Sequence, residues 1–175
     1  MSTAEDDKKL VVVLDINGVL FFRDTDLRHM VPSAVELIKW LNVHSDKFDY
    51  GVWSSKHAHN VERYVQRIQT LVPEFKPLFK FSRDHCLVGK QWTDVPFGTI
   101  KNLNRLWNAF PNHSWAKHAS SRTIAFDDTA DKYLHQLECL TLVDHGCDLE
   151  AQGEDMIDCV KRCYEAKFSN NNIQW

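Results

Sequence analysis

The sequence predicts an α/β protein in which a doubly wound, Rossmann-like parallel sheet is covered by helices on both faces. Apolar, strand-like segments alternate with amphipathic helical segments along the chain, which is typical of parallel sheets with right-handed crossovers. The first strand-like segment, residues 10–14, is an unbroken apolar run rich in Val, which favours a strand buried on both faces. We therefore expect this strand in the centre of the sheet.

The segments after the first strand repeat the alternation. Apolar residues recur at helical spacing in residues 31–42, and Pro32 lies where a helix can begin. Residues 48–55 indicate a short strand that ends on two serines, and residues 59–72 indicate an amphipathic helix. Residues 73–99 contain three prolines and two glycines between short apolar pieces, which predicts a small irregular or β insertion.

The second half of the chain continues in the same way. We expect a helix from about Ile100, a strand at residues 122–128 that ends on acids, and a short helix at residues 132–137. A further strand at residues 139–145 and a last helix at residues 154–167 follow. In the last helix acids come first and bases last, which suits the helix dipole.

Composition indicates an intracellular globular protein. A net charge of −3 gives no overall indication of nucleic-acid or membrane-surface binding. The five cysteines include no C-x-x-C pair, so we interpret them as core thiols in a reducing compartment. The N-terminus does not resemble a signal peptide, and no apolar segment approaches the ~20 residues of a membrane span. We expect one domain at residues 10–168, with a flexible segment at 1–9 and a polar tail at 169–175, in cytoplasm or nucleus.

Polar side chains follow three of the predicted strands where those strands end. Asp15 follows the first strand, Ser54 ends the second, and Asp127 and Asp128 end a later one. The carboxyl ends of parallel strands meet at one edge, where such folds bind ligands, and Lys101 opens a helix toward that edge. Carboxylates suit Mg²⁺, and a lysine with a hydroxyl suits phosphate oxygens. The pattern predicts a Mg²⁺ and phosphate site with a carboxylate nucleophile.

Each of these residues also has an ordinary structural interpretation. An acid at a strand end is often a turn or cap residue, and the Asp127–Asp128 pair would suit the start of a helix. Ser54 alone is more often a cap than a ligand, and Lys101 alone is usually a solvated surface residue. The order of these residues and their common position at strand ends support the site.

Four motifs in this order, LDINGVL, VWSS, TIKNLNRLW and AFDD, resemble those of the haloacid dehalogenase superfamily. The resemblance is closest to the branch of RNA polymerase carboxy-terminal-domain phosphatases and NLI-interacting-factor-like proteins, to which FSRDHC and FDDTADKY are also similar. It covers roughly residues 10–145. It implies a haloacid dehalogenase fold and a Mg²⁺-dependent phosphoric monoester hydrolase.

The resemblance also implies how the substrate binds. Asp15 would attack phosphorus to form an aspartyl-phosphate, Ser54 would bind a phosphoryl oxygen, and Lys101 would neutralise charge on both groups. No large cap lies between Ser54 and Lys101, which in this superfamily implies an open cleft and a macromolecular substrate. A phosphoserine or phosphothreonine segment of a protein is the preferred substrate, other phosphomonoesters such as nucleic-acid ends stay open, and residues 21–30 would form a flap beside the site.

Position 17 departs from the family pattern. The metal would be held by Asp15, by the backbone carbonyl of Asn17 and by the last two acids, with Asp128 favoured as direct ligand and Asp127 as the residue that orients Lys101. The family usually has Asp where this chain has Asn17, and that acid gives a proton to the leaving oxygen. An amide cannot deliver a proton, so we expect Mg²⁺ and phosphate binding with slow turnover.

Three explanations of Asn17 are open. The protein is a phosphatase that uses water, a histidine such as His57 or His59, or a good leaving group; or it is a catalytically silent adaptor for phosphorylated partners; or the Asn is an engineered trap. The two histidines are more typical of surface residues in the first turn of a helix. A receiver-like domain phosphorylated on Asp15 is a weaker alternative, because its acidic pair would come early in the chain.

Overall fold

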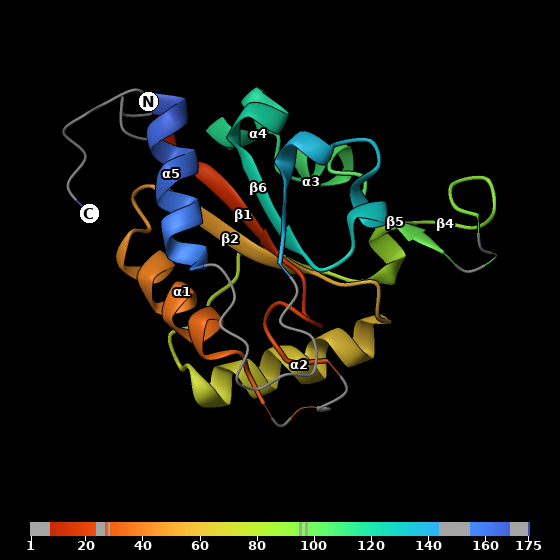
Figure 1. Cartoon of the computed structure of the whole chain (residues 1–175), viewed down its shortest axis with the longest axis horizontal. Helices are drawn as coiled ribbons and strands as arrows, with labels where there is room; N and C mark the ends of the chain where they lie inside the picture. The colour runs from red at the N-terminus through yellow and green to blue at the C-terminus, as the bar shows by residue number, and fades with distance from the viewer. Residues whose placement is uncertain are drawn as a thin grey trace.

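A computed structural model describes residues 8–23, 27, 29–94, 96, 98–143, 155–168 and 175. Its centre is a five-stranded sheet in the order β3-β2-β1-β6-β7 (Figure 1). Every neighbouring pair in this sheet is parallel, which confirms the predicted fold class. The strands are β1 (Leu10–Leu14), β2 (Phe48–Trp53), β3 (Lys80–Phe81), β6 (Thr123–Asp127) and β7 (Leu140–Leu142).

Helices cover both faces of the sheet, so successive side chains of β1 enter two different cores (Figure 1). Leu10, Val12 and Leu14 pack in the core beneath α1, α2 and α5, whereas Val11 and Val13 pack in the core beneath α3 and α4. This burial on both sides explains the unbroken apolar run. The helices are α1 (Pro32–Val43), α2 (Ala58–Leu71), α3 (Asn104–Ala109), α4 (Ser114–His118) and α5 (Met156–Phe168).

The helix predicted from about Ile100 is wrong at its start. Thr99–Ile100 form β5, which pairs antiparallel with β4 (Leu87–Val88), and α3 begins only at Asn104. Lys101 therefore does not open a helix but leaves a strand, and its N–H donates to the carbonyl of Lys132 at 2.8 Å. Antiparallel pairing with β4 overrides the local helical spacing of the apolar residues.

The predicted insertion is a small β structure, but part of it joins the central sheet. β3 pairs with β2, and η2 (Arg83–His85) leads from it into the β4–β5 hairpin. The short helix predicted at 132–137 is replaced by two 3₁₀ turns, η4 (Ala130–Tyr133) and η5 (Leu137–Cys139); a third, η3 (Ala119–Arg122), precedes β6. Residues 1–7, 144–154 and 169–174, which include Cys147 and most of both predicted terminal segments, lie outside the described residues.

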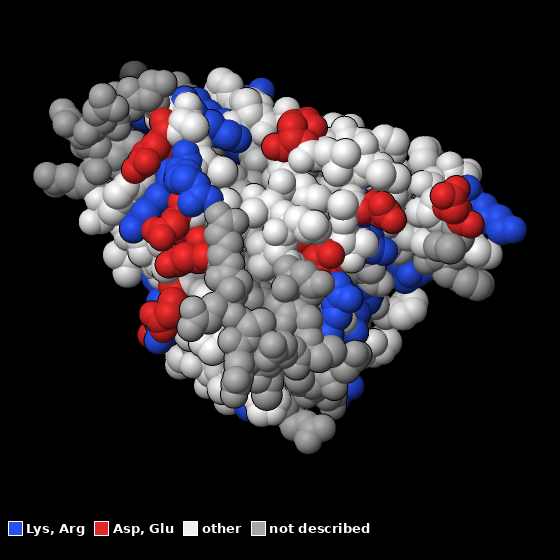
Figure 2. All heavy atoms as spheres, in the orientation of Figure 1, with Lys and Arg blue, Asp and Glu red and all other residues white. Residues whose placement is uncertain are grey.

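The remaining surface and core features agree with an ordinary α/β protein. Cys86, Cys139 and Cys159 are buried free thiols, as predicted. Acidic and basic side chains are interspersed along the flank of α1 and α5, so this flank has no single sign of charge (Figure 2). Among the helices that the structure describes, none combines the length and apolar character needed to cross a bilayer.

Gly51 allows the central sheet to pack closely against the segment before β3. A Cβ atom at Gly51 would lie 2.5 Å from Cδ1 of the buried Phe79 ring. We expect Gly51→Ala to lower the free energy of unfolding by about 1–3 kcal/mol, the usual cost of overpacking. Urea unfolding measures this loss, and Phe79→Leu in the same chain should recover part of it. An unchanged unfolding midpoint for Gly51→Ala would contradict this packing.

Candidate active site

The predicted site residues meet where the central strands end. Leu14, the last residue of β1, pairs with β2 on one side and with Phe126 of β6 on the other. Asp15 therefore leaves the sheet between its two neighbours, and its N–H donates to the carbonyl of Phe126 at 2.9 Å. Ser54 follows β2 and Asp127 ends β6, so all three polar side chains reach the same edge.

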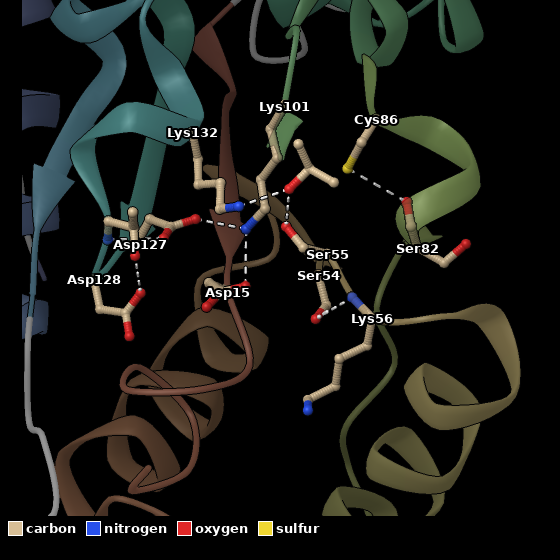
Figure 3. Close-up of polar contacts among 12 residues, drawn as sticks. Asp15, Ser54, Ser55, Lys56, Ser82, Cys86, Lys101, Asp127, Asp128 and Lys132 are labelled. Atoms are coloured by element: carbon tan, nitrogen blue, oxygen red, sulfur yellow. Dashed lines mark hydrogen bonds and ion pairs between the residues drawn. The ribbon is translucent and has the colours of Figure 1, made fainter. Parts of the chain in front are cut away.

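Lys101 occupies the space between two of the carboxylates (Figure 3). Its ammonium group lies 2.8 Å from Oδ1 of Asp15 and 2.5 Å from Oδ2 of Asp127, and the residue is 1% exposed. The ring of Tyr133 lies on another side, 5.7 Å from Nζ. A lysine buried this deeply needs both carboxylates, because burial without a partner would favour its neutral form.

Asp128 lies beside this pair and has its own cationic partner. Its Oδ2 accepts from Nε of Arg23 at 2.7 Å, and Nη2 of the same guanidinium lies at 2.5 Å. The hydroxyl of Thr129 donates to the other oxygen of Asp128 at 2.8 Å, and the Thr129 N–H donates to Asp127 at 3.0 Å. Gly18 has φ +76° and packs so closely on Asp128 that a Cβ atom there would overlap the carboxylate.

These groups open into a pocket of about 320 Å³. On the side away from the acids, the Ser54 hydroxyl accepts from the N–H of Lys56 at 3.2 Å, and the Ser55 hydroxyl accepts from Thr99 at 2.8 Å. Lys132 reaches the same side from η4 (Figure 3). The pocket thus has carboxylates on one side and hydroxyl and ammonium groups on the other, as a metal beside a phosphoryl group requires.

Burial and crowding of charge shift the pKa values of the central groups. Burial raises the pKa of Asp127 to about 7, although Lys101 works against this shift and the Asp15 charge adds to it. Burial also raises the pKa of Asp15, again opposed by Lys101. Burial alone would lower the pKa of Lys101, but the charges of Asp15 and neighbouring groups hold it well above its usual value. One lysine cannot fully compensate two buried carboxylates, so an additional cation is favoured here.

The acidic cluster fits a Mg²⁺ ion. Oxygen atoms of Asp15, Asp127 and Asp128 all lie within 4.8 Å of one another, and oxygen donors are the ligands that Mg²⁺ prefers. Gly18, by having no side chain, leaves the space that the Asp128 carboxylate occupies. Burial is the main cause of the raised pKa values of Asp15 and Asp127, and a neighbouring carboxylate adds to the shift of each.

The structure separates the predicted candidates into two groups. Asn17 is half-buried and lines the pocket with the acids, Ser54 and Lys101. His57 and His59 are exposed at the start of α2 and are not among the described residues that line the pocket. Phe21 and Phe22 are buried core residues rather than parts of a flap, and positions 24–26 and 28 of that segment lie outside the described residues.

Most of the cationic residues of the pocket were not predicted from the sequence. Arg23, Lys56 and Lys132 line the pocket together with Thr129. Arg23 belongs to the segment proposed as a flap, Lys56 follows the two serines at a strand end, and Lys132 lies inside FDDTADKY. Their position close to motif residues was the available signal, but charged residues in loops are usually solvated, and sequence alone does not distinguish the two cases.

Comparison with known families agrees with the geometry. The family model described as NLI interacting factor-like phosphatase matches residues 10–161, a span that includes every strand of the central sheet and every residue of the acidic cluster. No curated protein matches the chain.

Arg23 competes with a metal for Asp128, because the guanidinium already binds the carboxylate oxygen. We expect Arg23→Gln to bind Mg²⁺ about fivefold more tightly, the size of a partly exposed ion pair. Isothermal titration calorimetry with MgCl₂ measures the change. Arg63→Gln, at an exposed position of α2 outside the pocket lining, is the charge-matched control. Weaker binding by Arg23→Gln would mean that Arg23 supports the metal rather than competing with it.

The pKa of about 7 at Asp127 makes protons compete with the metal. Mg²⁺ affinity should rise about tenfold from about pH 6 to about pH 8, because the negative charge of ionised Asp127, close to Asp15 and Asp128, favours a cation at the site. Without metal the sign is opposite: the folded pKa of Asp127 lies above its ordinary value of 3.8, so stability falls as pH rises from about 3.8 through about 7. Calorimetric titrations and thermal unfolding at several pH values measure both trends. Asp127→Asn should flatten both, and an unchanged slope in that variant would exclude Asp127 as their source.

Proposed function

The chain belongs to the NLI interacting factor-like phosphatase family, and on that premise we propose that it acts on phosphomonoesters through an aspartyl-phosphate on Asp15. The observation that carries the proposal is the Asp15 carboxylate beside Lys101 at the base of a pocket. An acid in this position has a free face toward the pocket, while its other contacts fix its direction. Such a carboxylate suits attack on phosphorus.

The proposed reaction has two displacement steps. A carboxylate oxygen of Asp15 attacks phosphorus, the bond from phosphorus to the ester oxygen breaks, and that oxygen leaves with a proton from solvent or from a neighbouring acid. A water molecule then attacks the same phosphorus, loses a proton, and releases phosphate with the Asp15 carboxylate restored. Lys101 offsets the charge on Asp15 and the phosphoryl group throughout, and the Ser54 hydroxyl donates to a phosphoryl oxygen.

Asp15, Asp128 and the main-chain carbonyl of Asn17 are the ligands we propose for Mg²⁺. When bound, the ion would neutralise phosphoryl oxygens and lower the repulsion between substrate and nucleophile. We propose that Asp127 orients Lys101, because the Asp127 carboxylate makes the shortest contact with that ammonium group. Thr129 supports both assignments, since it donates to Asp127 through its N–H and to Asp128 through its hydroxyl.

Asn17 is expected to limit the rate of this reaction. Asn17 lines the pocket at a position where this family usually has an acid that protonates the leaving oxygen, but an amide has no proton to transfer at neutral pH. General acid–base catalysis is worth about 10²–10⁴ in rate, so the chain should turn over ordinary phosphoesters slowly. The binding of Mg²⁺ and phosphate does not depend on that proton.

A phosphoserine or phosphothreonine segment of a protein is the substrate we propose. Between Ser54 and Lys101 the described residues form α2, β3, η2 and the β4–β5 hairpin, with no separate domain above the pocket among them. A pocket without such a cover admits a residue that belongs to a large molecule.

A catalytically silent adaptor for phosphorylated partners is the second candidate, and Asn17 is the observation that favours it. The same pocket would then bind the phosphorylated residue and retain it. The two candidates share every contact except the proton at position 17, so the substitution of that residue separates them.

We expect Asn17→Asp to raise the rate of p-nitrophenyl phosphate hydrolysis with Mg²⁺ by about 10²-fold or more, because it restores a proton donor. Asp15→Asn should abolish hydrolysis in the Asn17→Asp chain. Release of p-nitrophenol measures both. If the unsubstituted protein is inactive and the Asn17→Asp variant is active, the result supports the adaptor function.

A matched control is Asn108→Asp, which makes the same chemical change at an exposed position of α3 outside the pocket lining. Equal activity of the given chain and of Asp15→Asn would show that Asp15 is not the nucleophile. No gain from Asn17→Asp would show that position 17 does not set the rate.

A further inference from the structure

Lys132 is a cation of the pocket that the proposed reaction does not use. It comes from η4, and its Nζ donates to the hydroxyl of Thr99 at 2.6 Å. That hydroxyl in turn donates to Ser55 at 2.8 Å, so the three side chains form one hydrogen-bonded row beside Ser54 (Figure 3). An ammonium group has three N–H donors, and the row uses one of those of Lys132.

The charge on Lys132 is not balanced by the carboxylates of the pocket. Asp15 and Asp127 bind Lys101, and Asp128 binds Arg23. Among the residues that the structure describes, no carboxylate forms a salt bridge with Lys132. Four cationic side chains and three carboxylates line the pocket, so a divalent metal and a phosphoryl dianion would leave one positive charge over.

Lys56 does not have the same role. Its Nζ lies over the ring of Tyr64, 5.4 Å from the centroid, and Figure 3 shows its side chain directed away from Lys101 and Lys132. The positive charge that lies next to Ser54, Ser55 and the proposed phosphoryl position, without a carboxylate partner among the described residues, is therefore that of Lys132.

Lys132 also lies at the boundary with a second pocket of about 560 Å³, which is lined in part by residues 90–94 and 98. Lys132 and Thr129 line both pockets, so the two pockets adjoin at these residues. The acids of the second pocket, Asp94 and Asp131, are exposed, and their charge is therefore screened by water. Lys132 is half-buried, where its charge acts more strongly.

We propose that Lys132, with Thr99 and Ser55, forms a subsite for a second anionic group of the substrate, next to the phosphoryl position. The inference rests on the proposed function and narrows its substrate class to phosphopeptides that carry a second phosphate or a carboxylate close to the phosphorylated residue. In an extended peptide, residues two apart point to the same side, so that spacing presents both anions to the pocket.

A purely structural role is the alternative for Lys132, because its bond to Thr99 also joins η4 to β5. Lys132→Gln tests the difference, since a glutamine amide retains a donor for Thr99 but has no charge. Lys132→Arg retains the charge. Lys39→Gln, on an exposed part of α1, is the matched control for the loss of a lysine.

The test is calorimetric binding to the full chain with MgCl₂, using three peptides with a non-hydrolysable phosphonate in place of the target phosphoserine ester. One has alanine two residues away, one has phosphoserine there, and one has glutamate. The given chain should bind a peptide with a second anion about tenfold more tightly than the alanine peptide, the size of a charge-assisted hydrogen bond. That ratio should fall to about one in Lys132→Gln and persist in Lys132→Arg and Lys39→Gln.

Preference for phosphoserine alone would assign the subsite to a second phosphate, and preference for both anions would assign it to acidic groups in general. A ratio near one in the given chain, or a ratio that survives Lys132→Gln, overturns the subsite while the proposed function stands. If none of the three peptides binds, the proposed function fails and the subsite fails with it.

Discussion

The contact of the Lys101 ammonium group with two buried carboxylates is the constraint on which the site depends. Two negative charges and one positive charge lie inside the protein, where water cannot screen them. Removing Lys101 would leave two buried carboxylates without this cation, which is far more costly than an unmade surface contact. The cluster therefore holds the ends of β1 and β6 and the segment after β5 in one relative position.

The backbone makes that contact possible. Asp15 and Asp127 are brought together by the parallel pairing of β1 with β6, which fixes their register. Lys101 is fixed from the opposite direction, because β5 precedes it and its N–H donates to the Lys132 carbonyl in η4. The irregular segments around the sheet thus place a lysine and a threonine beside the acids at the strand ends.

Much of this arrangement could be predicted from the sequence, because strand ends in a parallel sheet share an edge. The apolar run before Asp15 and the apolar run before Asp127 were sufficient to place those acids together. The path of Lys101 was not predictable, since it depends on the pairing of β4 with β5, and local spacing favoured a helix there. Arg23 and Lys132 were missed for a related reason: only the folded chain shows that these loop cations face carboxylates or hydroxyls rather than solvent.

The two outer strands of the sheet have a further consequence. β3 spans Lys80–Phe81 and β7 spans Leu140–Leu142, so each described edge offers few unpaired backbone groups. Short edges are a recognised means by which proteins prevent another chain from extending a sheet. Aggregation by strand addition is correspondingly disfavoured, and a bound peptide would gain little from main-chain pairing at these edges. Recognition of the proposed phosphopeptide would then depend on side chains at the carboxyl edge, which would make binding sensitive to the peptide sequence.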